Sequence, residues 1–133
     1  MDLSAIAASS IDKTAEEISR LNVDQLRHGL TASEGRLKRY RNNKYARVKN
    51  EMNPLPGLGN PDFILTGAFT SKIQTEVSGG LIGTHSYDEK APELEARDGA
   101  DNIYGLGPAR HKVYVEESLQ PAFMGGVNEA LNG

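Results

Sequence analysis

The sequence predicts an α+β fold: a small antiparallel sheet formed by one β-hairpin, with an N-terminal helix and a C-terminal helix packed on it. Three observations lead to this class. Residues 3–21 carry an apolar stripe at helical spacing, residues 72–86 alternate apolar and polar side chains around a Gly-Gly pair, and residues 108–118 favour a helix again. We expect the N-terminal helix over residues 1–21 and one α+β domain over residues 22–133.

The first helix is predicted from the absence of Gly and Pro between Leu3 and Leu21 and from the spacing of its apolar residues. These residues fall close to i, i+4 and i+7 intervals: Ile11, Ala15, Ile18 and Leu21. Beyond this helix, Gly29 and Gly35 are typical of turns, so the helix is expected to end near Leu21.

The middle of the chain predicts a short helix followed by a loop. Residues 39–52 place Tyr45, Val48 and Met52 on one side of a helix. Residues 53–61 hold three prolines and two glycines in nine positions, which interrupts any regular element. This Pro/Gly-rich loop is expected to become ordered when a partner docks.

The hairpin is predicted from a period of two. Three polar residues alternate with three residues of a half-buried face: Lys72, Gln74 and Glu76 with Ile73, Thr75 and Val77. Gly79-Gly80 is a strong signal for a two-residue turn, after which residues 81–86 return antiparallel to the first strand.

The C-terminal helix is predicted over Pro108–Ser118, because Pro is favoured in the first turn of a helix. Pro121 is expected to kink or end it, since proline lacks the N–H that a helix interior needs. Residues 123–131 continue the pattern only weakly, because Gly125 and Gly126 each cost on the order of 1 kcal/mol relative to alanine.

Composition restricts the functional classes. The 15 Lys and Arg against 18 Asp and Glu give a net charge of −3, so no global basicity indicates nucleic acid. Cysteine is absent, which excludes disulfides, thiol nucleophiles and cysteine-ligated zinc or iron–sulfur sites and fits a reducing cytoplasm. The first residues lack the basic start of a signal peptide, and no apolar run approaches the roughly 20 residues of a membrane span. We expect a soluble chain.

No motif for catalysis or metal binding is found. The three histidines lie far apart, without an HExxH pattern: His28, His85 and His111. The serines around the hairpin lack the Gly-x-Ser-x-Gly arrangement of a nucleophile: Ser71, Ser78 and Ser86. The stretches at 57–61 and 105–110 are rich in glycine but match no phosphate-binding loop. We therefore expect no catalytic residue, no cofactor and no metal.

A short acidic helix is predicted over residues 88–99, with Pro92 in its first turn and Gly99 past its end. The acidic residues in and after it do not follow the order of a calcium loop: Asp88, Glu89, Glu93, Glu95, Asp98 and Asp101. Carboxylates on a surface helix are mostly solvated or paired across a subunit contact. A small hydrolase using this cluster is the weaker alternative, and it predicts an activity that Glu93→Gln abolishes.

A basic run within residues 36–49 is interleaved with Tyr40 and Tyr45. It holds seven cations: Arg36, Lys38, Arg39, Arg41, Lys44, Arg47 and Lys49. One interpretation is pairing with the acidic 88–101 segment of a neighbouring subunit, which would orient the two copies. The other is a surface that faces DNA, because phosphate contacts need little more than such a patch.

Residues 64–77, "ILTGAFTSKIQTEV", resemble the "TG-x-[LF]-x-x-S-[IF]" signature of tailed-bacteriophage virion-morphogenesis proteins of the tail-completion, or neck, family. The residues at the signature positions open the first strand of the hairpin: Thr66, Gly67, Phe69, Lys72 and Ile73, with Lys72 where the signature has Ser. The later segment "NIYGLGPARHKVYVEESLQPAF" is similar in order and spacing to the family's C-terminal part. The segments "QLRHGLTASEG", "ILTGAF" and "GADNIYGL" also resemble phage and prophage proteins, over most of the chain after Asn22.

The resemblance implies a non-enzymatic structural protein of the virion, made in the host cytoplasm and located at the head-to-tail joint. Such a subunit assembles as a homo-oligomeric ring and binds the phage portal or connector and the tail or neck proteins. We expect its subunit interface on the hairpin and the segment before it: Phe63, Ile64, Leu65, Thr66, Gly67, Phe69, Ile73, Val77, Leu81 and Ile82. The basic run is expected to face a partner or packaged DNA. The alternative function is a small nucleic-acid-binding module that uses the basic 36–49 segment.

Overall fold

The computed structural model describes residues 1–33, 35–36, 47, 51, 68–78 and 81–133. Along these residues the elements follow in the order α1 (Leu3–Arg27), α3 (Ala68–Ser71), β1 (Ile73–Ser78), β2 (Leu81–Ser86), α4 (Ala91–Asp98), α5 (Ala100–Ile103), α6 (Pro108–Tyr114), the π-helical turn η1 (Val115–Leu119) and α7 (Gln120–Asn132). The predicted α+β class, with one hairpin between an N-terminal and a C-terminal helix, is confirmed.

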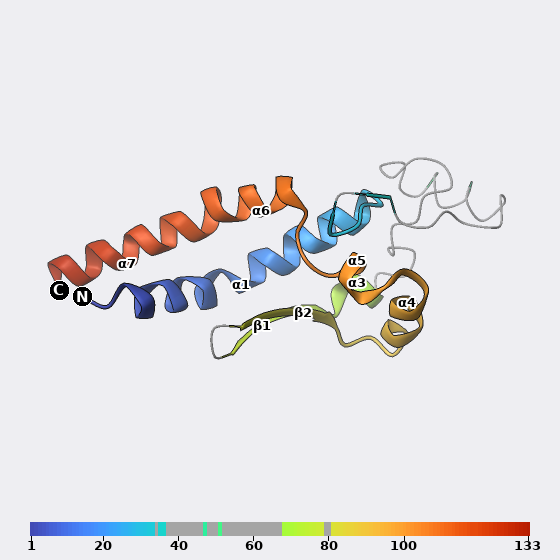
Figure 1. Cartoon of the computed structure of the whole chain (residues 1–133), viewed down its shortest axis with the longest axis horizontal. Coiled ribbons are helices and arrows are strands. Elements are labelled where there is room, and N and C mark those ends of the chain that lie inside the picture. The colour runs from blue at the N-terminus through green and yellow to red at the C-terminus, as the bar shows by residue number, and fades with distance from the viewer. Residues whose placement is uncertain (34, 37–46, 48–50, 52–67, 79–80) are drawn as a thin grey trace.

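Helix α1 is the middle layer of the molecule (Figure 1). The continuous helix α6–η1–α7 runs back along one side of α1, which brings the two termini together, and β1 packs on another side. Helices α4 and α5 lie at the end opposite the termini. No helix within the described ranges is both long and apolar enough to cross a membrane.

Helix α1 is longer than the sequence pattern predicts. The Asp2 carboxylate caps its start by accepting the Ala5 N–H at 3.1 Å, but the helix continues past Leu21 to Arg27. It ends where Gly29 takes a positive φ of 73°, a conformation that glycine adopts without a Cβ clash. The expected boundary between residues 21 and 22 therefore falls inside one helix.

The hairpin has the predicted period. Ile73 pairs with Ser86 at its base and Ser78 pairs with Leu81 near its tip, which leaves residues 79–80 between the strands. Ile73 and Ser86 are buried at the base, whereas Ile82 on the same face is 48% exposed. The sheet is therefore covered at its base and uncovered toward its tip.

The acidic helix is confirmed as α4, with Pro92 in its first turn and Gly99 at its C-cap with a positive φ of 89°. Of the two outcomes expected at Pro121, a kink or an end of the helix, the end is wrong, because α7 continues through it to Asn132. The wider π turn immediately before Pro121 explains this, since a proline ring clashes with the carbonyl of residue i−4 in a regular helix.

Two apolar clusters form the core around the second half of α1. One joins α1 to the hairpin and to α4 and α5: Leu26, Phe69, Ile73, Ala91 and Ile103. The other joins α1 to α6: Ile18, Leu21 and Tyr114.

Several sequence predictions fall on residues outside the described ranges. Of the helix predicted over residues 39–52, Arg47 and Glu51 are described, and both are helical. The Pro/Gly-rich loop at residues 53–61 and the residues 63–67 before α3 lie outside the described part of the chain.

Candidate functional site

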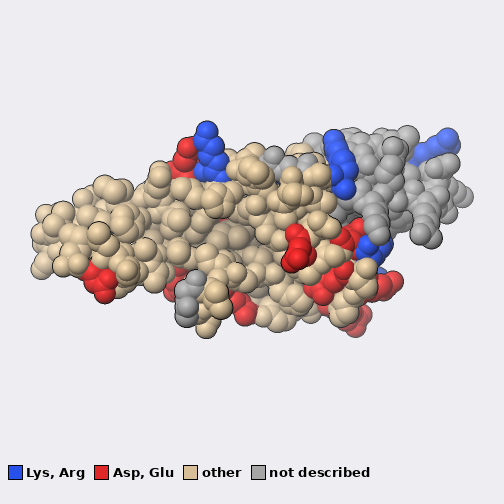
Figure 2. Space-filling view, in the orientation of Figure 1, with Lys and Arg blue, Asp and Glu red and all other residues tan. Residues whose placement is uncertain are grey.

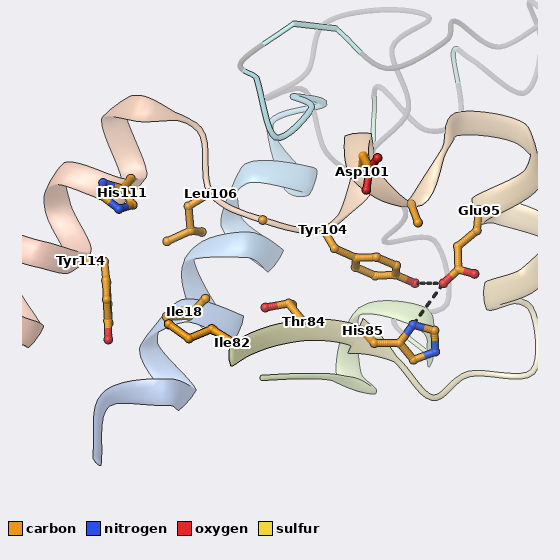
Figure 3. Close-up of a pocket in the computed structure, with 12 residues that line it drawn as sticks. Ile18, Ile82, Thr84, His85, Glu95, Asp101, Tyr104, Leu106, His111 and Tyr114 are labelled. Atoms are coloured by element: carbon orange, nitrogen blue, oxygen red, sulfur yellow. Dashed lines mark hydrogen bonds and ion pairs between the residues drawn. The ribbon is translucent and has the colours of Figure 1, made fainter. Parts of the chain in front are cut away.

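A cleft of about 530 Å³ opens between the inner face of the hairpin and the helices α1 and α6 (Figure 3). Its walls come from six places in the sequence: α1, β2, α4, α5, the segment between α5 and α6, and α6. A cleft of this volume is large enough for a small molecule or for two or three side chains of a protein partner.

One end of the cleft is apolar. Its walls are formed by four side chains, labelled in Figure 3: Ile18, Ile82, Leu106 and Tyr114. Ile18 and Tyr114 belong to the second core cluster, so this wall is fixed by the fold. The facing residue, Ile82, lies on the uncovered part of the hairpin and is 48% exposed.

The other end of the cleft is polar, and its centre is Glu95. The carboxylate oxygen Oε1 of Glu95 accepts a hydrogen bond of 2.8 Å from the Tyr104 hydroxyl and lies 3.2 Å from Nδ1 of His85 (Figure 3). Burial, reinforced by this hydrogen bond, raises the pKa of Tyr104 well above its ordinary value of 10.0. The phenol therefore stays protonated and keeps donating to Glu95, which links α4 to the chain after α5.

Two buried amides hold the segment that carries Tyr104 and Leu106. Asn22 donates to the Ile103 carbonyl at 2.9 Å and accepts the Gly105 N–H at 2.8 Å. One helical turn later, Gln25 donates to the Gly105 carbonyl at 2.9 Å and accepts the Gly107 N–H at 2.7 Å. Both amides are fully buried, so α1 replaces a neighbouring strand as the hydrogen-bonding partner of residues 103–107.

The acidic residues gather around α4 and α5, toward the lower right of Figure 2. Glu89, Glu93 and Asp101 are exposed, whereas Asp88 and Asp98 are 7% and 8% exposed and have partners within the chain. The Lys90 N–H, with Lys72 beside it, lowers the pKa of Asp88. The Asp98 carboxylate accepts a hydrogen bond of 2.7 Å from the Arg97 guanidinium. The acidic set therefore contains two structural carboxylates, Asp88 and Asp98, and two that line the polar end of the cleft, Glu95 and Asp101.

In chemical terms this arrangement suits binding. The apolar end can bury an aliphatic or aromatic side chain, and the carboxylates of Glu95 and Asp101 favour a cation beside it. No group of three His, Asp or Glu side chains that could hold a metal ion occurs among the residues that the structure describes.

The residues predicted for a subunit interface are separated by the fold. Phe69 and Ile73 lie in the chain's own core at 5% and 6% exposure, so they have almost no surface left for a neighbour. They are buried because Leu26 of α1 packs onto the base of the hairpin. Val77 is half-buried, and Leu81 and Ile82 are exposed at 78% and 48%. The other five lie outside the described ranges: Phe63, Ile64, Leu65, Thr66 and Gly67.

Two members of the basic run are described. Arg36 and Arg47 are exposed, and the Arg36 guanidinium donates to the His28 carbonyl at 3.3 Å. The remaining five lie outside the described ranges: Lys38, Arg39, Arg41, Lys44 and Lys49.

The sequence analysis missed the cleft. It treated His85 as a hairpin residue and Glu95 as one carboxylate of a helix, and it did not single out Tyr104. These three are brought together only when the α5–α6 segment is fixed on α1 by Asn22 and Gln25. An Asn and a Gln three residues apart on the apolar side of a helix were the available signal.

Comparisons with protein-family models, with curated proteins and with solved structures found no match to this chain.

Proposed function

We propose that this chain is a non-enzymatic structural subunit that assembles with copies of itself, and that it acts at the head-to-tail joint of a tailed phage. The station in the virion rests on the resemblance of residues 64–77 and of the later segments. Self-assembly is supported by one observation, the uncovered hairpin tip beside the cleft.

The tip is unusual for a surface hairpin. Ile82 and its cross-strand partner Val77 form an apolar pair on the inner face near the end of the two-stranded sheet, and the adjacent Leu81 is exposed on the opposite face. A hairpin of two strands is stable only when packed against something else, and here the helices cover its base alone. A neighbour seated on the tip would complete that cover.

A neighbouring copy also suits the polar end of the cleft. The basic run at residues 36–49 interleaves seven cations with Tyr40 and Tyr45, while the cleft pairs an apolar wall with Glu95 and Asp101. Charge and polarity are thus complementary between the basic run of one copy and the cleft of the next. A contact between two different surfaces is heterologous, and it generates a ring when the rotation closes.

The non-enzymatic part of the proposal is supported by the state of the cleft's polar groups. The Oε1 atom of Glu95 already has both Tyr104 and His85 as partners, so these side chains hold the cleft together. The remaining partners in the proposal are a portal or connector on one side of the ring and tail or neck proteins on the other.

The proposal is tested by measuring the mass of the chain in solution with sedimentation velocity over a concentration series. Ile82→Asp is expected to weaken self-association at least about tenfold, because a buried Ile contributes roughly 1.5–3 kcal/mol. Val113→Asp is the matched control: Val113 is an apolar residue of α6 at 37% exposure, and this variant should assemble like the wild type.

Two outcomes count against the proposal. A wild-type chain that stays monomeric at all concentrations, and also with a phage connector present, contradicts it. Binding to duplex DNA that falls steeply between low and physiological salt, without self-association, favours the nucleic-acid-binding alternative.

A further inference from the structure

The end of the molecule that holds both termini is nearly free of charge. We define the arm as Leu3–Ile11 of α1 together with α7, Gln120–Asn132. Glu129 is the sole charged residue in these two segments, whereas 25% of the whole chain is charged. Figure 2 shows the same contrast, with the arm almost wholly tan. Helical surfaces that face water normally carry charged residues at about one position in three or four.

The arm also lacks an apolar core of its own. In this part of the chain, all of which the structure describes, Ser10 is the one buried residue, and α7 has none. Helix α7 is rich in apolar residues, yet two of its largest, Met124 and Leu131, are 54% and 68% exposed. Since most helical stability in proteins comes from burying an apolar face, the arm lacks the cover that its sequence is suited to.

The packing of the arm gives it two different edges. Inside it, Ile6 meets Gly126 so closely that a Cβ on Gly126 would lie 2.7 Å from an Ile6 methyl group. Residues on the opposite sides of the two helices therefore point away from each other. On α7 these are large side chains: Met124 and Leu131, at i and i+7, lie on the same face of the helix and two turns apart. On α1 they are small and exposed: Ser4 and Ala8, each two residues from Ile6 and therefore about 200° around the helix from it.

We propose that these edges join neighbouring copies: the α7 edge of one arm packs against the α1 edge of the next. Large side chains on one edge and small ones on the other are complementary in shape, as in the packing of knobs into holes between helices. Both edges lack charge, so their contact leaves no charge buried without a partner. On these two edges a partner with a charged surface would find no opposite charge to pair with.

This inference rests on the proposed self-assembly and names a second contact within it. Helix α7 has 13 residues and the α1 segment has nine, so the two edges are about 20 Å and about 14 Å long. Two single helix edges of these lengths bury less than the roughly 800 Å² per partner of a standard interface. The arm contact therefore adds to the contact at the hairpin and cleft, and both are heterologous, which a closed ring requires.

The register of the contact follows from the ring. The proposed ring has its rotation axis along the arm, so neighbouring copies lie at the same height and α1 of the next copy lies beside α7 in the register that α1 has within one copy. Because Ile6 lies opposite Gly126 in the chain, Ala8 of the neighbour is expected opposite Met124.

The natural sequence has no cysteine, so disulfide trapping reads this contact without background. Two full-length variants, Ala8→Cys and Met124→Cys, are mixed and oxidised with diamide. The expected result is a covalent dimer in the mixture, formed at least tenfold faster than in either variant alone. A mixture of Ala8→Cys with Val113→Cys is the matched control for random collision.

A second experiment avoids new thiols. Met124→Ala with Leu131→Ala shortens the large side chains and keeps a strong helix former at both positions. It should weaken assembly about tenfold or more in sedimentation velocity, while the helical circular dichroism signal stays unchanged.

The outcomes separate the two proposals. If the wild-type chain assembles but the cysteine mixture gives no more dimer than the Val113→Cys control, the arm contact is overturned and self-assembly stands. Fast dimers in Ala8→Cys alone would show two like edges meeting and would also overturn it. A monomeric wild-type chain would contradict both.

Discussion

The two ends of α1 differ in what surrounds them. From Ile18 to Leu26 the helix is packed on the hairpin, on α4 and α5 and on α6, and it contributes two fully buried amides. From Leu3 to Ile11 it touches α7 and buries a single serine. One continuous helix thus begins in an exposed arm and ends in a packed body.

This difference separates the residues that stabilise the single chain from those that are free to contact another molecule. The body is stable through contacts within the chain, whereas the described residues leave about half or more of the surface of Met124, Leu131, Leu81 and Ile82 uncovered. Residues of the same type in the two regions should therefore respond differently to the same substitution.

Leucine gives the largest expected contrast. Leu26 is fully buried at the centre of the first core cluster, and Leu26→Ala should lower the free energy of unfolding by about 2–5 kcal/mol. Leu131 is 68% exposed on the arm, and Leu131→Ala should change it by less than about 0.5 kcal/mol. Urea denaturation at a concentration below self-association measures both. Equal losses would mean that the arm is packed within one chain after all.

Asparagine gives the second contrast. Asn22→Leu removes two hydrogen bonds and leaves the buried Ile103 carbonyl and the partly buried Gly105 N–H without partners, which should cost about 2–4 kcal/mol. Asn128→Leu, at an exposed position of α7, should change stability by less than about 0.5 kcal/mol. The same urea titration compares them. A loss below 1 kcal/mol for Asn22→Leu would show that Gln25 alone is sufficient to hold the segment.

The sequence predicted the elements whose signals are local. The alternation at residues 72–77 and the Pro92 and Gly99 boundaries of α4 depend on neighbours in the chain, and these features were confirmed. The end of α1 was placed too early, at Leu21, because it was set from the turns expected at Gly29 and Gly35 and not from Asn22 and Gln25, whose amides are buried. Their partners lie about 80 residues away, at Ile103 to Gly107.

The same reasoning explains why the cleft was not predicted. Its polar centre joins His85, Glu95 and Tyr104 from three elements, and no spacing in the sequence specifies that meeting. Pro121 is the converse case: a proline is a strong local signal for a helix end, but the helix continues because a π turn precedes it. Local chemistry determined the elements, and long-range hydrogen bonds determined the site.

The smallest contrast lies within the arm, between two adjacent glycines of α7. A Cβ at Gly125 would meet nothing within 4 Å, so Gly125→Ala should gain up to about 1 kcal/mol of stability from helix propensity. A Cβ at Gly126 would lie 2.7 Å from Ile6, so Gly126→Ala should lose that gain because α1 must move away. Thermal unfolding of the two variants, at the dilution used above, measures the difference. If both alanines stabilise the chain equally, then α1 and α7 are not in close contact, and the two edges of the arm cannot be assigned from Ile6 and Gly126.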